Sequence, residues 1–594
     1  MDMAHNHPNP QFRRNNWLLL DGEWEFEVGK VAIDKDSLSK TINVPYCPES
    51  KKSGLELKDV ITDCIYARNI ELTAQQLEHR LVIHFGAVDH EATVYINGNF
   101  VGYHCGGYTH FEVDISEYAI VGSNRLVVVV HDDIRENVPS GKQSLGAPHG
   151  CFYTPCTGIW QSVWMEETPK QYVRSVKFYP DVENCKVTAV VDVLGCDDCD
   201  VSVFYQGQKV GQASARFAHQ KQFEISLSQK HIWELGSGRL YDVQIAFGDD
   251  TVQSYFGLRS TQFRDGKFLL NGKSVFQRLV LDQGYYPDGL YTGTREEWIC
   301  DIQYALRLGY NGARLHQKVF EPAYLYECDK AGYMVWGEFP NWGVDYYNLD
   351  ALGVVVNQWK ESVEYLFNHP SIVVWCPLNE VWESLTDEMK HRDVRFVEAI
   401  YAVTKLLDST RPCIDVSGGH HGRFTDCFDF HCYYNYEELK KHIDNLVENN
   451  KFTARNLFPL HHEEAHQDYQ TGLAVQLSEY GGIRLGECNG WGYTLQPSEQ
   501  AFVEEYIKQT KAIMDCKLIC GFCYTQLYDV EQEQNGLLTY QRKPKLSEEA
   551  MDAIALCNKS MAAIEFDIVS LLSESQVASI DATSLGQVAI RKIK

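Results

Sequence analysis

Carboxylate side chains follow strand-like apolar runs at three points of the sequence. Glu380 follows the run in "SIVVWCPLNEVWES", with Asn379 directly before it. Glu479 ends the run in "LAVQLSEYGG", and Glu338 ends the run in "VWGEF". Hydrolysis of a glycosidic bond needs two carboxyl groups across that bond, and a single group cannot do it. Glu380 and Glu479 are therefore a candidate pair, and Glu338 is a third candidate for the same site.

The surroundings of Glu380 favour a pocket over an open surface. A glutamate after a strand is most often an ordinary surface residue. Here Trp375 and Trp382 flank it, and Asn379 places an amide beside the carboxylate. The two glycines after Glu479 let the backbone turn sharply without blocking a pocket. Both features point to a site that binds a small molecule.

Three regions of different pattern must position these side chains. Residues 1–168 hold short alternating strands with turn signals such as the Asn-Gly pair at 97–98, which predict a jelly-roll β-sandwich. Residues 169–258 hold strands spaced about ten residues apart, which is typical of an immunoglobulin-like β-sandwich. Residues 259–560 are expected to form a (β/α)8 barrel, and residues 561–594 a polar tail.

The barrel prediction depends on alternating periodicities. Helical patterns over 296–309 and 322–332 each precede a strand-like run. The active sites of such barrels lie at the carboxyl ends of the strands. Glu380 and Glu479 are therefore expected in the mouth of the barrel.

Composition and charge exclude several classes of partner. The 594 residues are too many for one core, and 44% hydrophobic with 23% charged residues is ordinary for a globular protein. The net charge of −27 argues against nucleic acid and anionic membrane surfaces. No apolar run reaches the roughly 18 residues of a membrane span. An N-terminus without an apolar core and 19 scattered cysteines predict a cytoplasmic protein with reduced thiols.

Several segments together resemble family 2 of the glycoside hydrolases, which includes β-galactosidases, β-glucuronidases and β-mannosidases. The segments are "WLLLDGEWEFE", "GIWQSVWME", "HPSIVVWCPLNE", "LSEYGG" and "NGLLTYQRKPK". The resemblance covers nearly the whole chain and implies the same order of domains. It implies a retaining mechanism through a covalent glycosyl-enzyme intermediate, with Glu380 as acid/base and Glu479 as nucleophile. This chemistry requires no cofactor.

The resemblance also implies supporting residues for substrate binding. Asn379 corresponds to a residue that donates to the sugar 2-hydroxyl, and Arg314 in "YNGARLH" to an arginine that holds the nucleophile ionised. Tyr433 in "FDFHCYY" resembles a tyrosine that hydrogen-bonds the nucleophile, although Tyr434 is an alternative match. Trp491 in "NGWGY" is either an aromatic wall for the sugar or a packed loop residue.

Departures from the family pattern bear on the choice of sugar. His316 and Lys318 in "RLHQKVF" stand where many members have Arg-x-Ser-His-Tyr-Pro. Lys318 could pair with a uronic-acid carboxylate or point to solvent. The Asn-x-Lys motif of glucuronidases is absent at Asn535, so a galacturonidase that uses another cation remains open. Asp282 is an acceptor for a sugar hydroxyl or a loop cap, and no convincing set of metal ligands is found.

Four hypotheses follow. The first is a retaining exo-β-glycosidase that acts on terminal β-galactosides or β-uronides, and the second is a β-galacturonidase or β-glucuronidase specialised for uronides. The third is a non-catalytic carbohydrate-binding protein. The fourth, metal-assisted hydrolysis, would need the His-rich stretches "GGHHGRF" and "LHHEEAH" as ligands. A carbohydrate is the expected partner, and the sugar, its linkage and assembly into a homo-oligomer are left open.

Overall fold

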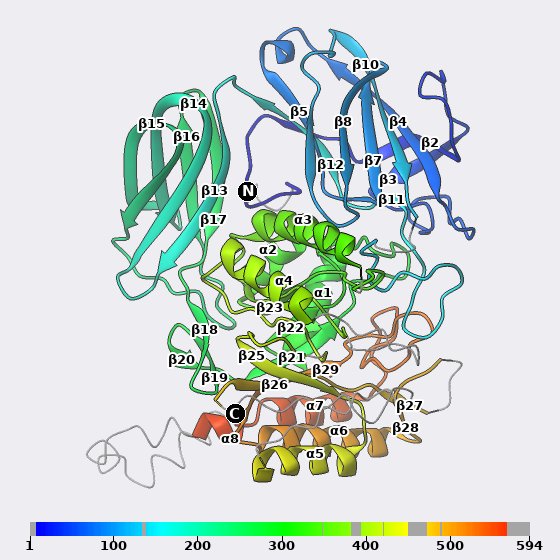
Figure 1. The fold of residues 1–594 in the computed structure, drawn as a ribbon, viewed down its shortest axis with the longest axis vertical. Coiled ribbons are helices and arrows are strands. Elements are labelled where there is room, and N and C mark those ends of the chain that lie inside the picture. Colours follow the sequence, from blue (N-terminus) through cyan, green and yellow to red (C-terminus); the bar gives the residue numbers. More distant parts are fainter. Residues whose placement is uncertain are drawn as a thin grey trace.

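A computed structural model shows two β-sandwiches packed beside a barrel (Figure 1). It describes residues 7–133, 138–346, 348–381, 394–419, 421–449, 472–486 and 490–566. No helix within these ranges is both long enough and apolar enough to cross a membrane. Every cysteine within them is a free thiol.

The first sandwich consists of two antiparallel sheets, with strand orders β3-β2-β4-β10-β7-β8 and β1-β12-β5-β9. The predicted hairpin is confirmed, because β7 (Glu91–Ile96) pairs with β8 (Asn99–Cys105), and Asn97 and Gly98 both have positive φ. The residues of β7 alternate between buried and half-buried, as expected for a strand with one face on a core. The other strands are β1 (Trp17–Leu19), β2 (Gly22–Val28), β3 (Lys40–Val44), β4 (Asp63–Leu72), β5 (Arg80–Phe85), β9 (Phe111–Asp114), β10 (Gly122–His131) and β12 (Val163–Thr168).

The second sandwich is organised by one long strand, β14 (Lys186–Tyr205). Its first half pairs with β13 (Tyr172–Asp181), and its second half pairs with β16 (Tyr241–Phe247). The register shifts between Asp192 and Cys196, where the strand passes from one layer to the other. The remaining strands are β15 (Gln208–Ser226) and β17 (Asp250–Phe256).

A curled parallel sheet forms the barrel, as the sequence predicts. Its strand order is β24-β23-β22-β21-β29-β26-β25. The strands are β21 (Gln277–Asp282), β22 (Gly312–Leu315), β23 (Met334–Glu338), β24 (Ile372–Cys376), β25 (Cys427–Cys432), β26 (Ala474–Gly481) and β29 (Ile519–Thr525).

Residues 413–417 fill the eighth place in the barrel. They form an irregular segment between β24 and β25. Parallel bridges join Trp375 to Cys413 and Asn379 to Ser417. On the other side, the backbone N–H of Asp426 donates to the carbonyl of Cys413 at 3.1 Å. This segment therefore closes the ring next to Glu380.

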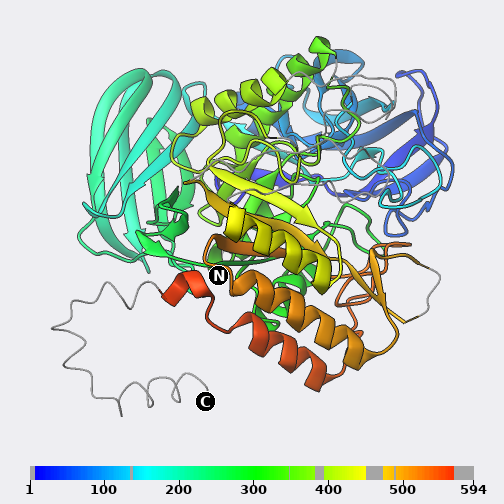
Figure 2. The ribbon, with the colours of Figure 1, turned by 60° about the horizontal axis from the view of Figure 1, so that its bottom comes forward.

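Helices cover the outside of the barrel, and α5, α6 and α7 lie side by side (Figures 1 and 2). The helix predicted at 296–309 is α1 (Arg295–Arg307), and the one predicted at 322–332 is α2 (Pro322–Ala331). Thr294 and Glu297 form a capping box that starts α1. The others are α3 (Leu349–Leu366), α4 (Val394–Leu407), α5 (Tyr436–Asn449), α6 (Glu499–Met514), α7 (Glu548–Asn558) and α8 (Ala563–Phe566). Residues 567–594 of the expected tail lie outside the described ranges.

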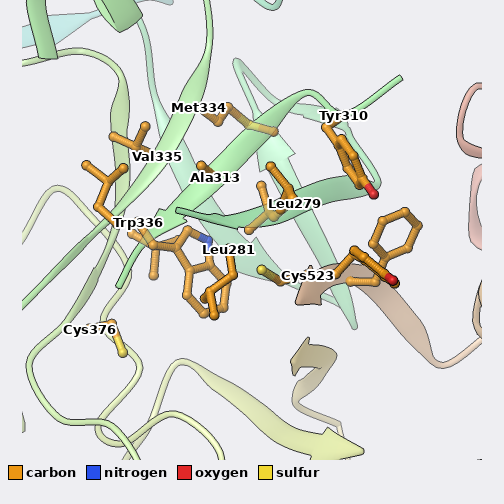
Figure 3. Packing of buried hydrophobic residues seen from close by; sticks show 14 of the residues in the cluster. Leu279, Leu281, Tyr310, Ala313, Met334, Val335, Trp336, Cys376 and Cys523 are labelled. Carbon is orange, nitrogen blue, oxygen red and sulfur yellow. The ribbon is translucent and has the colours of Figure 1, made fainter. Parts of the chain in front are cut away.

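Side chains from several strands fill the interior of the barrel. Figure 3 shows Leu279 and Leu281 of β21 close to Trp336 of β23 and Cys523 of β29. All residues of β23, β24 and β29 are buried, because the sheet is covered on both faces. This explains the continuous apolar runs that precede the candidate carboxylates.

Candidate active site

Both candidate carboxylates lie at the mouth of the barrel. Glu479 is within the last residues of β26, and Glu380 follows β24. Glu380 has a φ of 49°, and its backbone N–H donates to the carbonyl of Ser417 at 2.8 Å. Such left-handed conformations of residues other than glycine are rare and concentrate at functional sites.

His431 on β25 connects the two carboxylates. One oxygen of Glu380, one oxygen of Glu479 and a ring nitrogen of His431 all lie within 4.8 Å of one another. Nδ1 of His431 is 2.8 Å from Glu380, and its Nε2 is 3.5 Å from Glu479. Burial lowers the pKa of His431, but Glu479 and Glu380 outweigh burial and hold it above the usual value. His431 therefore contacts both carboxyl groups, and its positive charge favours the ionised form of Glu479.

Arg314 at the end of β22 organises the acidic side chains. Its Nε donates to Glu338 at 2.6 Å, and one terminal nitrogen donates to Glu479 at 2.9 Å. The other terminal nitrogen donates to the side-chain oxygen of Asn379 at 3.0 Å. The guanidinium is fully buried. Because the three acceptors belong to three other strands or loops, Arg314 fixes the position of Glu479 relative to Asn379.

Glu338 and His316 lie behind Arg314. Glu338 accepts from Arg314 with one oxygen, and its other oxygen is 3.1 Å from Nδ1 of His316. Both side chains are buried, and burial lowers the pKa of His316 well below its usual value. Glu338 therefore has the position of a counter-charge to Arg314 rather than of a second attacking group.

The electrostatic environment keeps Glu479 ionised. Burial alone would raise the pKa of Glu479, but the positive charges of His431 and Arg314 outweigh burial and lower that pKa to about 2. The hydroxyl of Tyr433 donates to the second carboxylate oxygen. An ionised, oriented carboxylate is what a nucleophile at this position requires.

Asn379 holds an amide donor ready for a ligand. Its side-chain oxygen accepts from Arg314, and its backbone N–H donates to Asn341 at 2.9 Å. Its side-chain Nδ2 is buried and has no hydrogen-bond partner within the described residues. Buried donors are rarely left unpaired, so the amide suits a substrate hydroxyl.

A stack of aromatic rings extends from the nucleophile to the rim. The rings of Tyr433 and Tyr493 are parallel at 3.6 Å, and Trp491 meets Tyr493 edge-on at 5.2 Å. The indole N–H of Trp491 donates to the carbonyl of Gly150, in a loop of the first sandwich, at 2.6 Å. Tyr433 is thus the tyrosine at Glu479, and Trp491 is at the outer end of this stack.

Lys318 is buried among backbone carbonyls and aromatic rings. Its ammonium donates to the carbonyl oxygens of Gly284 at 2.9 Å and Tyr291 at 2.5 Å. The rings of Tyr291 and Phe320 also lie within 5.0 Å of it. Pointing to solvent was a wrong prediction, because the side chain is buried. Two of the three N–H donors of its ammonium are used by backbone carbonyls.

Asp282 is also occupied by the protein. One oxygen accepts from the backbone N–H of Gly284 at 3.0 Å and from the hydroxyl of Tyr528, and the other accepts from Tyr324 at 3.0 Å. These contacts are those of a loop-capping aspartate.

His431, Tyr493 and Lys142 were not predicted from the sequence. His431 lies in "FDFHCYY", which ends a buried strand in the same way as the candidate glutamates, so this position was a usable signal. Lys142 comes from the first sandwich, and its Nζ lies 4.6 Å from the ring centre of Trp342 in the barrel. No periodicity in the sequence relates that loop to the barrel.

Within the described ranges, two clusters have the ligand types that a metal needs. One consists of Glu380, His431 and Glu479, and the other of His90, Glu91 and Cys105 in the first sandwich. In the first, Arg314 already supplies a cation to Glu479. His421 from "GGHHGRF" is 2.7 Å from Asp415 and 3.1 Å from Asp429. His420 and the stretch "LHHEEAH" lie outside the described residues.

The fold and this carboxylate-lined mouth together define the class of glycoside hydrolases. Two sequence models match the chain: "Glycosyl hydrolases family 2, sugar binding domain" over residues 42–169 and "Glycosyl hydrolases family 2, TIM barrel domain" over residues 261–552. Together they match more than half of the chain. The chain therefore belongs to family 2 of the glycosyl hydrolases.

Relatives of known name have two different activities. A β-galactosidase of Photobacterium profundum is 24% identical over 458 residues, which are 70% of this chain and 41% of that protein. A β-glucuronidase of Streptococcus agalactiae is 25% identical over 415 residues, 62% of this chain and 67% of that protein. The chain thus spans less than half the length of the first relative.

Solved structures show the same fold. The β-glucuronidase of Bifidobacterium dentium, complexed with coumarin-3-O-glucuronide, superposes with a TM-score of 0.77 at 18% identity over 92% of this chain and 97% of that one. The β-glucuronidase of Ruminococcus gnavus, in complex with D-glucuronic acid, superposes with a TM-score of 0.74 at 18% identity over 94% of this chain and 100% of that one.

Proposed function

We propose that this protein is a retaining exo-β-glycosidase that hydrolyses terminal β-galactosides or β-uronides by double displacement. The observation that carries the proposal is the pair of carboxylates in one barrel mouth. Oxygens of Glu380 and Glu479 lie within 4.8 Å of each other. Retaining glycosidases need carboxyl groups about 5–5.5 Å apart, whereas inverting ones need about 6.5–9.5 Å.

In the first half of the reaction, Glu479 attacks the anomeric carbon of the bound sugar. The bond between that carbon and the leaving oxygen breaks, and the proton of Glu380 is transferred to this oxygen. Asn379 donates to the 2-hydroxyl through its free Nδ2, a contact that strengthens toward the transition state. The result is a covalent ester between the sugar and Glu479.

In the second half, Glu380 acts as a base. Once Glu479 is esterified, the Glu380 carboxylate takes a proton from the attacking water. The water oxygen bonds to the anomeric carbon while the bond to Glu479 breaks. Arg314 and Tyr433 then stabilise the released carboxylate.

Kinetics of two variants test these roles. Glu479→Gln should lower kcat on nitrophenyl β-glycosides by at least about 10³-fold, because no group remains to form the ester. Glu380→Gln should lower kcat much more for alkyl than for nitrophenyl leaving groups, because only the alkyl leaving groups need protonation.

Glu183→Gln is the control, since Glu183 is exposed on the second sandwich. Full activity of Glu479→Gln would refute the proposed nucleophile. Sugar binding without turnover by the wild type would instead indicate a carbohydrate-binding protein.

A further inference from the structure

Lys142 belongs to the first sandwich but lies at the mouth of the barrel. The backbone N–H of Ser140 donates to the carbonyl of Trp342 at 2.8 Å, and that of Gly141 donates to the same carbonyl at 3.1 Å. Trp342 belongs to the loop after β23. A Cβ at Gly141 would lie 2.4 Å from the carbonyl oxygen of Gln317, so the glycine permits this close approach. The loop that carries Lys142 is therefore tied to the barrel by its backbone.

The ammonium of Lys142 lies over a ring beside the catalytic residues. Its Nζ is 4.6 Å from the ring centre of Trp342. The indole N–H of Trp342 donates to the carbonyl of Asn379 at 3.3 Å, directly before Glu380. Lys142 is only 6% exposed. Among the described residues, its ammonium has a ring contact but no hydrogen bond or ion pair.

The surroundings keep Lys142 charged. Burial lowers its pKa, but Cys151, Glu533, Glu479 and Glu380 outweigh burial and raise it. Both oxygens of Glu533 accept hydrogen bonds from Tyr153 and Asn535 instead. A buried ammonium without an acceptor is costly, and an anionic ligand would offset this cost.

Three other cations close to the mouth donate hydrogen bonds to the protein. Arg314 donates to Glu338, Glu479 and Asn379. Lys318 donates to two backbone carbonyls. Arg484, which is half-buried, donates one of its five N–H groups to the carbonyl of Gly490 at 2.6 Å. Lys142 differs from these three cations because no described residue accepts a hydrogen bond from its ammonium.

We propose that Lys142 pairs with the C6 carboxylate of a terminal uronic acid, so that β-uronides are preferred over neutral β-glycosides. This inference rests on the proposed function and names the substrate class of the same site. An ammonium with three free N–H donors forms charge-assisted hydrogen bonds to a carboxylate, while a neutral hydroxymethyl group leaves the charge uncompensated. The aromatic face of Trp342 holds the ammonium in place while the substrate enters.

Matched substrates isolate the C6 group. Nitrophenyl β-galacturonide and β-galactoside differ only at C6, as do the β-glucuronide and β-glucoside. The wild type should show a higher kcat/KM for the uronide of at least one pair. In Lys142→Met the ratio of uronide to neutral kcat/KM should fall about 100-fold, the effect of losing a charge-assisted bond at a desolvated site. Lys142→Arg should restore part of the ratio.

Two further variants serve as comparisons. Arg484→Met removes the competing cation and should leave the ratio within a few-fold of the wild type. Lys30→Met removes a lysine whose side chain is 83% exposed and controls for the loss of one charge. Thermal midpoints show whether each variant is folded.

Calorimetric titration with uronic deoxynojirimycin and with neutral deoxynojirimycin gives a readout without turnover. Lys142→Met should weaken only the uronic inhibitor. The inference is overturned if the wild type prefers the neutral member of both substrate pairs, or if Lys142→Met weakens binding of both inhibitors equally. It is also overturned if the uronide-to-neutral ratio of kcat/KM falls in Arg484→Met and not in Lys142→Met. In the first case the proposed function still stands when Glu479→Gln abolishes turnover of the neutral glycosides.

Discussion

Tyr433 adjusts the proton affinity of Glu479 through one hydrogen bond. Its hydroxyl donates to the carboxylate and to no other carboxylate in the described site, and burial together with Glu479 keeps its own pKa well above the usual value. Tyr433 therefore remains a donor throughout the neutral range. A donor to the ionised form lowers the pKa of a carboxylate.

Tyr433→Phe should thus raise the pKa of Glu479 above its value of about 2. The acid limb of the kcat/KM profile then moves to higher pH, and kcat falls about 10–100-fold because the nucleophile is less well oriented. The pH profile of both proteins on one nitrophenyl glycoside checks this. An unchanged acid limb would mean that the hydroxyl does not contribute to ionisation.

The sequence was informative about residues whose role follows from their place on a strand. Glu380 and Glu479 both lie where a buried parallel strand reaches the mouth of the barrel, and that place follows from apolar runs and helical periodicity. Lys318 shows the limit of this reasoning. Whether a lysine faces solvent, substrate or backbone carbonyls depends on tertiary contacts such as those to Gly284 and Tyr291.

At the scale of elements, the irregular segment between β24 and β25 supports the acid/base side of the site. Gly418 has a φ of 63°, and a Cβ there would lie 2.3 Å from atoms of the His431 ring. Ser417 donates its hydroxyl to Asp429 at 2.8 Å and lies 3.0 Å from Nε2 of His431. The segment thus positions the imidazole that contacts both carboxylates.

Gly418→Ala should displace His431 and lower kcat at least about 10-fold. The left-handed backbone at this position should also lower the free energy of unfolding by about 1 kcal/mol. Gly272→Ala is a matched control, because Gly272 has a φ of 73° but nothing within 4 Å of its Cβ position. The control should lose a similar amount of stability and keep its kcat. Equal kcat in the two variants would show that His431 tolerates displacement.

At the scale of the whole molecule, the first and second sandwiches are joined by a buried ion cluster. Arg14 donates to Asp250 of β17 at 2.9 Å and to Glu166 of β12 at 2.8 Å. Burial would raise the pKa of Glu166, but His7, His84 and Arg14 outweigh burial and lower it well below its usual value. Removing one partner of such a cluster leaves the other charges buried and unpaired.

Arg14→Met should therefore destabilise the protein by about 3–5 kcal/mol at pH 7. Because the pKa of Glu166 is depressed in the folded state, its contribution is fully present above the unfolded value near 4.5. It begins to decrease below that value and is lost as the pH falls through the folded pKa. The difference in thermal midpoint between wild type and variant should narrow from pH 7 to pH 4. Arg216→Met is the control, because the side chain of Arg216 is 61% exposed. If the difference in thermal midpoint between wild type and Arg14→Met stayed constant from pH 7 to pH 4, the cluster would not have this role.

The arrangement of domains also explains what the sequence could not show about the site. Jelly-roll, immunoglobulin-like and barrel regions are recognisable because each has its own periodicity. Contacts between the domains leave no periodicity in the sequence. Trp491 donates to Gly150, and Lys142 lies over Trp342, only because two separately folded surfaces meet there. Residues that one domain contributes to the site of another were therefore missed.

The identity of the nucleophile is tested most directly by trapping the intermediate. A 2-deoxy-2-fluoro-β-glycosyl fluoride of the preferred sugar lacks the 2-hydroxyl contact and carries a leaving group that needs no acid, so the ester should form and hydrolyse slowly. Mass spectrometry of the digested protein should then find one sugar on the peptide that contains "LAVQLSEYGG", attached at Glu479. A label on another residue, or steady turnover of this reagent with no labelled peptide, would contradict the account.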